Sequence, residues 1–283
     1  MTASARRARL PIALTIAGSD SGGGAGLQAD LKTFLALGVH GTSVVTCVTA
    51  QNPVAVTATQ AMPPAIVLAQ LEAVWAELPP VAVKTGLLFN AAIIQAVVAF
   101  WEARHPNSGS PRRPRKKAPP LIVDPVMIAT SGARLLQADA TAALTSQLLP
   151  LATLITPNVD ELAALLGRPV DEFRSPAELR CGARELRSRY GCAVLAKGGH
   201  LTNDTEATDI FWDGREELML TAPRIRGVNT HGTGCTYAAA ITGYLALGCR
   251  LSHAVQLAKE HITQAIAQSV RIGKHTALNP QWR

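Results

Sequence analysis

Residues 12–34 read IALTIAGSDSGGGAGLQADLKTF, which is an apolar run, a glycine-rich turn and an amphipathic segment in immediate succession. The run at 12–17 is nearly continuous in apolar residues, as is typical of a strand buried on both faces of a parallel sheet. The turn therefore connects a strand to a helix. Because ligands of parallel α/β sheets bind beyond the carboxyl ends of the strands, this turn is the first place where a site is expected.

The same alternation continues along the chain. Further buried strands are predicted at 43–48, 81–84, 121–124, 151–156 and 193–197. Helices are predicted at 67–78, 93–101, 140–149, 161–166, 177–190, 234–247 and 252–271, and a hairpin is predicted from 209–212 and 217–220. This order predicts an α/β fold, a three-layer α/β/α sandwich with a central, mostly parallel sheet. We expect one domain over 10–275, a basic tail at 1–9 and a basic, proline-rich surface insert at 105–120.

Composition and charge exclude several classes of protein. The chain has 283 residues, of which 48% are hydrophobic and 17% charged, so it has material for a core and no sign of disorder. Its formal charge is +7, but nine positive charges lie in 1–9 and 104–117, and removing these nine lowers the balance from +7 to −2. The folded body is therefore not basic, and no nucleic-acid partner is predicted.

Cysteine usage and hydropathy indicate the compartment. The five cysteines are widely spaced and contain no C-x-x-C, which excludes a disulfide framework and the usual zinc spacing and fits a reducing environment. No run approaches the ~18 apolar residues of a membrane span. The apolar run that follows the N-terminal arginines is short and is interpreted as a strand rather than a signal peptide. We expect a cytoplasmic protein with no membrane partner.

The glycine-rich turn at 18–26 is the first candidate site. Its glycines allow a ligand to approach the backbone closely and supply unhindered N–H groups. It is not a Walker A loop, because no Lys-Ser/Thr follows the glycines, and Ala29 stands where a dinucleotide-binding G-x-G-x-x-G motif has its third glycine. The structural alternative is a flexible turn with Asp30 on a solvated helix face.

A second polar cluster follows two later strands. Asp124 ends one strand, where a carboxylate needs a cation or donor partner, and Mg²⁺ with phosphates and waters would supply such a setting. Asn158 and Glu161 follow the next strand. Their Asn-x-x-Glu spacing before a helix also fits a capping box, and taken alone the residues favour the cap.

The third cluster, THGTGCT at 230–236, opens a predicted helix. Unpaired N–H groups and the helix dipole make such a start a site for an oxyanion or phosphate. The same position is expected to lower the pKa of the Cys235 thiol, so that the thiolate accepts a proton. The alternative is a buried cysteine beside a tight turn. The string KGGH at 197–200 is a weaker candidate phosphate loop.

Together these strings resemble the hydroxymethylpyrimidine/phosphomethylpyrimidine kinases of thiamine biosynthesis, which belong to the ribokinase-like superfamily. The matching strings are LTIAGSD at 14–20, GGAGLQADLKTF at 23–34, AQN at 50–52, DPVM at 124–127, TPN at 156–158 with Glu161, KGGH at 197–200 and THGTGCT at 230–236. They span roughly 12–270 in the order of the family. The first and last strings are specific, and the middle ones corroborate them.

The resemblance implies an ATP- and Mg²⁺-dependent kinase. Such an enzyme phosphorylates the hydroxymethyl group of 4-amino-5-hydroxymethyl-2-methylpyrimidine and then the resulting monophosphate. It implies the following roles: Asp30, Gln51, Gly18 and Leu87 at the pyrimidine; Asp124 and Glu161 at Mg²⁺; Asn158, Lys197, Thr233 and Thr236 at the nucleotide phosphates; and Gly232, Gly234, Cys235 and Lys197 in phosphoryl transfer. Relatives form dimers, so a homodimer is expected.

Two positions depart from the wider pattern. Leu87 stands where relatives usually have Met, so one wall of the ring pocket is expected to differ in shape. Cys235 stands where most of the superfamily has Asp, as in the pyrimidine-kinase branch.

Rival functions remain open at this point. They are a vitamin B6 kinase of the same branch, a non-catalytic small-molecule sensor on the same scaffold, and a nicotinamide oxidoreductase, which the glycine spacing disfavours. A sensor would not need the residues of phosphoryl transfer. The presence of all four, Asp124, Glu161, Lys197 and Cys235, therefore speaks against it.

If Cys235 is a general base, Cys235→Ala is expected to lower kcat by roughly 10²-fold or more. Steady-state kinetics with saturating ATP and pyrimidine alcohol measure this effect. Turnover close to that of the unchanged chain would contradict the role.

Overall fold

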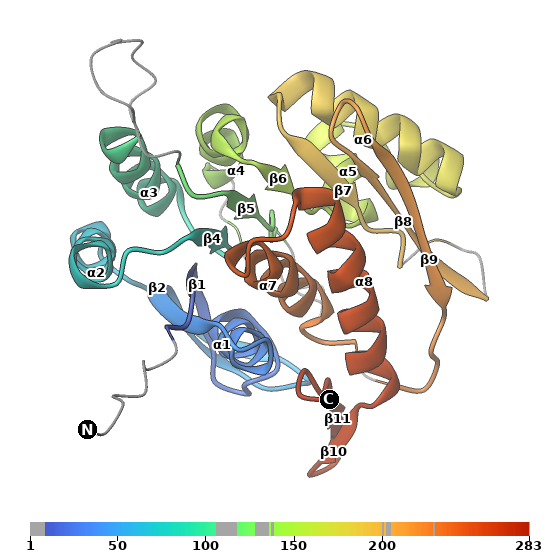
Figure 1. Cartoon of the computed structure of the whole chain (residues 1–283), viewed down its shortest axis with the longest axis horizontal. Coiled ribbons are helices and arrows are strands. Elements are labelled where there is room, and N and C mark those ends of the chain that lie inside the picture. The colour runs from blue at the N-terminus through green and yellow to red at the C-terminus, as the bar shows by residue number, and fades with distance from the viewer. Residues whose placement is uncertain are drawn as a thin grey trace, which may run out of the picture.

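The protein is a layered α/β structure, shown in Figure 1. This computed structural model describes residues 9–105, 118–127, 136, 139–199, 201, 205–228 and 230–282. Most of the expected basic tail and insert (1–8 and 106–117) lies outside the described residues, as do His200 and Asn229.

The described strands form a nine-stranded sheet and a separate two-stranded hairpin. The strands are β1 (Ile12–Asp20), β2 (His40–Gln51), β3 (Val56–Ala61), β4 (Ala82–Thr85), β5 (Leu121–Val123), β6 (Leu154–Ile155), β7 (Ala193–Ala196), β8 (Glu206–Trp212), β9 (Glu217–Pro223), β10 (Val270–Ile272) and β11 (His275–Ala277). The order in the large sheet is β3-β2-β1-β4-β5-β6-β7-β8-β9. The pairs from β2 to β7 are parallel, whereas β3, β8 and β9 join antiparallel.

Helices cover both faces of this sheet. They are α1 (Gly26–Ala36), α2 (Pro64–Glu77), α3 (Ala91–Arg104), α4 (Ala140–Ala143), α5 (Val159–Leu166), α6 (Pro176–Tyr190), α7 (Thr233–Ala246) and α8 (Leu251–Ala267). Alternate residues of the central strands point to opposite faces. Accordingly, Ala13 and Ala82 pack with α1 and α7, whereas Leu14 and Val83 pack in the core beneath α2 and α3. The three-layer sandwich with a mostly parallel sheet is confirmed.

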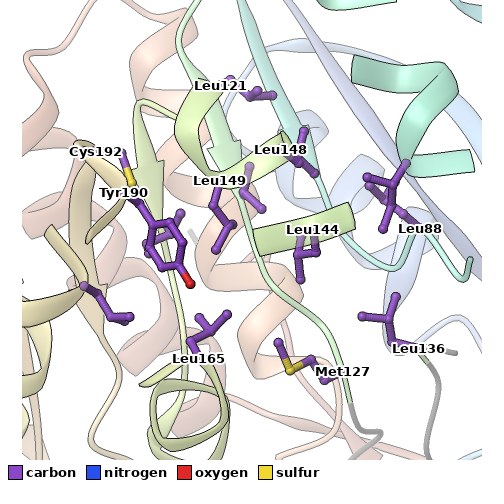
Figure 2. Packing of buried hydrophobic residues seen from close by; sticks show 14 of the residues in the cluster. Leu88, Leu121, Met127, Leu136, Leu144, Leu148, Leu149, Leu165, Tyr190 and Cys192 are labelled. Carbon is purple, nitrogen blue, oxygen red and sulfur yellow. The ribbon is translucent and has the colours of Figure 1, made fainter. Parts of the chain in front are cut away.

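The larger core lies on the side of α2 to α6. Figure 2 shows part of it, where Leu121, Leu148, Leu149 and Tyr190 pack between the sheet and the helices. Central strands are apolar on both faces because both faces are covered, which explains their continuous apolar runs.

Several predicted boundaries are wrong. The helix expected at 140–149 is an α-helical turn followed by a π-helix (Leu144–Leu148), and a 3₁₀ turn (Leu149–Leu151) replaces the start of the strand expected at 151–156. Pro150 has no N–H to extend the helix. The helix expected to reach residue 271 ends at Ala267, before the β10–β11 hairpin. The sequence analysis does not predict strand β3, because this edge strand is only six residues long and none of its residues is buried, so it has no continuous apolar run.

The parallel arrangement brings the polar strings to one edge of the sheet. The carboxyl ends of β1, β4, β5, β6 and β7 lead into the turns that contain the candidate residues. None of the helices in the described ranges combines the length and apolar composition that a bilayer crossing requires.

Candidate active site

One cavity of about 1000 Å³ lies at this edge of the sheet. It reaches from the end of β1 to the space between β9 and α8. Its wall includes eleven of the residues that the sequence singled out: Gly18, Gln51, Leu87, Asp124, Asn158, Glu161, Lys197, Gly232, Thr233, Gly234 and Cys235. A volume of this size accommodates two small ligands together.

The end of the cavity near β1 is lined by Gly18, Leu87 and Gln51, among others. A Cβ atom on Gly18 would lie 2.7 Å from Cys47 Sγ and 3.4 Å from Leu87 Cδ2, so only glycine leaves this wall open. Gln51 lies nearby, with its Oε1 accepting a hydrogen bond of 3.1 Å from Thr49 Oγ1. The wall and the amide together suit a flat, polar-edged ring.

Asp30 differs from its expected role at the ring and from its solvated alternative. It is completely buried, with Lys84 Nζ 2.8 Å from each carboxylate oxygen and Thr15 Oγ1 donating at 2.6 Å. Asp30 is not part of the cavity wall, whereas Lys84 is. The role that the structure indicates for Asp30 is to hold the Lys84 ammonium in place, because a buried cation needs a partner of opposite charge.

The charge of Lys84 is stabilised despite its burial. Burial acts to lower the pKa of Lys84, but Asp30, Cys235 and Asp124 outweigh it and raise the pKa above its ordinary value. Lys84 therefore brings a fixed positive charge to the cavity, beneath the thiol of Cys235.

Asp20 and His231 join the glycine-rich turn to the start of α7. Asp20 Oδ2 accepts from Gly24 N (3.1 Å) and Ala25 N (2.8 Å), and His231 Nε2 lies 3.0 Å from the same oxygen. Burial acts to raise the pKa of Asp20, but these hydrogen bonds outweigh it and lower the pKa. His231 Nε2 also lies 3.3 Å from Gln51 Nε2, so the histidine borders both the end of β1 and the end of β2.

The N-terminus of α7 turns its first amides toward the cavity. Gly232 precedes the helix with φ +82°, and a Cβ atom there would lie only 1.8 Å from Gly24 O. Thr233 N donates to Thr230 O (3.1 Å). The N–H groups of Gly234 and Cys235 have no backbone acceptor in the described part of the chain. Two backbone donors at the positive end of a helix therefore lie in the cavity wall, as an anion site requires.

Thr236 is placed differently from the expectation. It is buried, is not part of the cavity wall, and its N–H is bonded to Gly232 O at 2.9 Å. Its position in the helix places it one residue beyond the last free amide, so it closes the first turn instead of lining the phosphate region.

The expected low pKa of Cys235 is wrong for this arrangement. Burial raises the pKa of the thiol to about 11, and the charges of Asp30 and Asp124 add to this effect. The ammonium of Lys84 and the Gly26 N–H act in the opposite direction without outweighing them. The expectation of a low pKa takes only the positive helix terminus into account. The carboxylates of Asp30 and Asp124 lie near the thiol only in the folded chain, and the sequence alone does not show this.

Asp124 and Lys197 form the polar centre of the cavity. Lys197 Nζ lies 3.0 Å from Asp124 Oδ1, and Thr156 Oγ1 donates to the same oxygen at 2.9 Å. Burial acts to raise the pKa of Asp124, but Lys197, Lys84 and Thr156 outweigh it and lower the pKa. A Cβ atom on Gly234 would lie 3.2 Å from Lys197 Nζ and 3.7 Å from Asp124 Oδ2, so the free amides adjoin this pair.

Asn158 and Glu161 form the capping box that the spacing suggested. Glu161 N donates to Asn158 Oδ1 and Asn158 N to Glu161 Oε2, both at 2.8 Å, and both residues also line the cavity. Burial raises the pKa of Glu161 to about 7, Lys197 acts to lower it, and Asp124 acts to raise it. The cap and a ligand role are therefore compatible.

The donor set around Asp124 suits magnesium better than zinc. Among the described residues there is no group of three His, Cys, Asp or Glu that could enclose an ion. Asp124 and Glu161 are two carboxylates on the wall of an open cavity. Mg²⁺ is commonly held by one or two carboxylates together with substrate phosphates and water, so these residues fit it.

Sequence reasoning missed several residues of the cavity. Lys84 is the last residue of the strand predicted at 81–84, and a lysine at the end of an apolar strand carries no motif. The far end, formed by Asp209, Arg224 and Lys259 among others, comes from β8, β9 and α8. These positions are distant in sequence, and only the fold brings them together.

Comparisons with known proteins point to one family of kinases. A family model described as phosphomethylpyrimidine kinase matches residues 20–279. A hydroxymethylpyrimidine/phosphomethylpyrimidine kinase from Synechococcus elongatus is 46% identical and covers 94% of this chain and 95% of its own. Among solved structures, phosphomethylpyrimidine kinase from Clostridium difficile is 39% identical, with a TM-score of 0.75 over 90% of this chain and 99% of its own.

A related vitamin kinase has a similar structure. Pyridoxal kinase from Staphylococcus aureus, solved in complex with AMP-PCP and pyridoxal, is 31% identical. Its TM-score is 0.83 over 97% of this chain and 94% of its own.

Replacing Lys84 by Met is expected to destabilise the fold strongly, because it leaves the Asp30 carboxylate buried without its cation. Breaking such a pair costs about 3–5 kcal/mol, and the double variant Lys84→Met/Asp30→Leu should recover part of the loss. Urea unfolding at pH 7 measures both. Arg174→Met, which breaks an exposed ion pair with Asp171, is the control and should cost at most about 1 kcal/mol. A Lys84→Met variant as stable as this control would contradict the analysis.

The raised pKa of Cys235 predicts slow alkylation in the ligand-free protein. A thiol with a pKa near 11 carries very little thiolate at neutral pH, so we expect Cys235 to react with iodoacetamide at least about tenfold more slowly than the exposed Cys181. Peptide mass spectrometry over a time course at pH 7.5 compares the two sites in one molecule. The rate at Cys235 should still be rising at pH 10, whereas a plateau below pH 8 would indicate a stable thiolate.

Proposed function

The chain belongs to the phosphomethylpyrimidine kinase family, and we propose that its cavity transfers phosphoryl groups with the residues described above. It is a phosphotransferase of the ribokinase-like fold that phosphorylates 4-amino-5-hydroxymethyl-2-methylpyrimidine and then its monophosphate, in thiamine diphosphate biosynthesis. The observation that carries the site assignment is the pair of amides at Gly234 and Cys235, which have no backbone acceptor among the described residues and lie beside Lys197 and Asp124 in one cavity.

The two ends of the cavity accommodate the two substrates. The pyrimidine occupies the end near β1, where Gly18 and Leu87 line the cavity and Gln51 offers both a donor and an acceptor. ATP occupies the other end, with its phosphates near Asn158, Lys197 and Thr233. This arrangement places the hydroxymethyl group and the terminal phosphate at the start of α7, where charge develops during transfer.

The transfer itself needs little beyond position and charge. The substrate hydroxyl oxygen bonds to the γ-phosphorus while the bond from that phosphorus to the bridging oxygen breaks, so ADP leaves and the hydroxyl proton is released. In the second step an oxygen of the bound monophosphate attacks instead. The amides of Gly234 and Cys235 and the ammonium of Lys197 hold the transferring charge.

Two roles remain: Asp124 and Glu161 are the candidate Mg²⁺ ligands, and Cys235 is the candidate proton acceptor. Asp124 and Glu161 would hold the ion, directly or through water. When bound, the ion would neutralise phosphate charge and also offset the Asp124 carboxylate, which otherwise raises the pKa of Cys235. Cys235 is placed to accept the hydroxyl proton as a thiolate, which Lys84 stabilises beforehand, and the transfer leaves a neutral thiol.

We also propose one kinase domain over 10–275, location in the cytoplasm and assembly as a homodimer. The domain proposal is supported by the continuous sheet, and the cytoplasmic location by the free, scattered cysteines. The homodimer follows only from the family resemblance.

A coupled ADP-release assay with three acceptors tests the substrate assignment. The pyrimidine alcohol and its monophosphate should both be consumed, and pyridoxal should show a lower kcat/KM than either. A higher kcat/KM for pyridoxal would favour a vitamin B6 kinase, the alternative to which the structural similarity with pyridoxal kinase points. Thermal stabilisation by a ligand without ADP release would favour the sensor.

Gly234→Ala is expected to lower kcat by about 10²–10³-fold, because the added methyl group lies between the free amides and Lys197 Nζ. The melting temperature should change little, since that methyl group points into the cavity. Cys181→Ala, at an exposed position of α6 outside the cavity, is the control and should keep the activity of the unchanged chain. Equal activities of the two variants would contradict the role given to the α7 amides.

A further inference from the structure

A buried ion pair closes the cavity at the end away from Asp124. Lys259 on α8 and Asp209 on β8 approach to 2.8 Å, with side chains only 12% and 5% exposed. Lys259 Nζ also donates to Ala207 O at 2.9 Å. Both residues line the cavity, and no step of the proposed transfer uses either one.

The second carboxylate oxygen of Asp209 reaches the loop after β7. Asp209 Oδ1 accepts a hydrogen bond of 2.9 Å from Gly198 N, directly after Lys197. Asp209 is therefore divided between two tasks: Oδ2 binds the ammonium on α8, and Oδ1 fixes the backbone that carries the central lysine. Charged partners make both hydrogen bonds stronger than neutral ones.

The same loop is restrained from its other side. Arg224, directly after β9, donates to Gly199 O at 2.8 Å and to Leu201 O at 2.9 Å. A Cβ atom on Gly198 would lie 2.0 Å from Thr208 O, so the loop is packed directly on β8. The amide side of the loop thus depends on Asp209, and its carbonyl side depends on Arg224.

We infer that Lys259 and Asp209 are positioning residues that hold the Lys197–Gly199 loop in the geometry that binds the nucleotide phosphates. The inference rests on the proposed function, because it assumes that ATP occupies this end of the cavity. Lys259 fixes the Asp209 carboxylate, Asp209 fixes the Gly198 amide, and that amide sets the direction from which Lys197 reaches Asp124. A shift of the loop would move the ammonium of Lys197 away from the anion site.

The surroundings of Asp209 explain why a charged residue stands at this position. Asp209 without Lys259 would be a buried carboxylate that keeps the Gly198 N–H as its backbone donor but has lost its cation, which is costly. A neutral residue at 209 would satisfy Gly198 but would not connect the loop to α8. The pair therefore links the helix, the strand and the loop through one side chain.

The test compares Lys259→Met, Asp209→Asn and the double variant in the full chain. Lys259→Met should raise the KM for ATP by about tenfold and lower kcat less, while the KM for the pyrimidine alcohol stays within about twofold. Asp209→Asn keeps an oxygen for Gly198 N, so its effect should be smaller. The double variant should resemble Asp209→Asn, because the two side chains act through one contact.

Direct binding separates positioning from a general loss of folding. The affinity for a non-hydrolysable ATP analogue, measured by calorimetry without turnover, should fall in parallel with the rise in KM. Arg180→Met is the matched control, since it breaks an ion pair of 2.7 Å with Glu217 outside the cavity and should leave both constants unchanged. If Lys259→Met lowers kcat with neither KM nor analogue affinity altered, the inference is overturned.

The assay also distinguishes the two levels of proposal. If the unchanged chain shows no ATP-dependent phosphorylation of the pyrimidine alcohol, the proposed function fails, whatever the variants do. If the unchanged chain is active and Lys259→Met has the ATP affinity of the Arg180→Met control, only the positioning role fails.

Discussion

The ammonium of Lys84 and the carboxylate of Asp30 meet below the floor of the cavity, and the rest of the site is arranged around that contact. The lysine comes from β4 and the aspartate from α1, and both side chains are completely enclosed. Two charges withdrawn from water in this way are tolerated only while they remain together. The contact therefore fixes α1 against the sheet and leaves a positive charge directed at Cys235, which neither residue could provide alone.

Backbone contacts impose a second constraint. The glycine-rich turn after β1 and the start of α7 are more than 200 positions apart in the sequence. They nevertheless touch through Gly24 and Gly232, and Asp20 and His231 bond across the same junction. Close approach of two main chains requires positions without side chains, which is why the glycines of the two strings are interdependent.

The sequence was sufficient for the architecture and for eleven residues of the cavity wall. Apolar runs identified the central strands, and the rule that ligands bind at their carboxyl ends located Asp124, Asn158 and Lys197 correctly at one edge. The errors share a physical cause. The burial of Asp30, the high pKa of Cys235 and the enclosure of Thr236 depend on neighbours from other elements, and a single sequence contains no information on those distances. The capping box at Asn158 could be predicted because all its atoms lie within four consecutive residues.

The contact between Gly24 and Gly232 also determines where this protein can be re-engineered. With main-chain atoms at van der Waals limits, no side chain can be introduced at that junction without separating the two segments, so the acceptor end cannot be enlarged from there. Leu87 is different, since it contributes only a flexible aliphatic side chain to the opposite wall. Attempts to admit bulkier alcohols should therefore begin with libraries at that leucine and leave both glycines as they are.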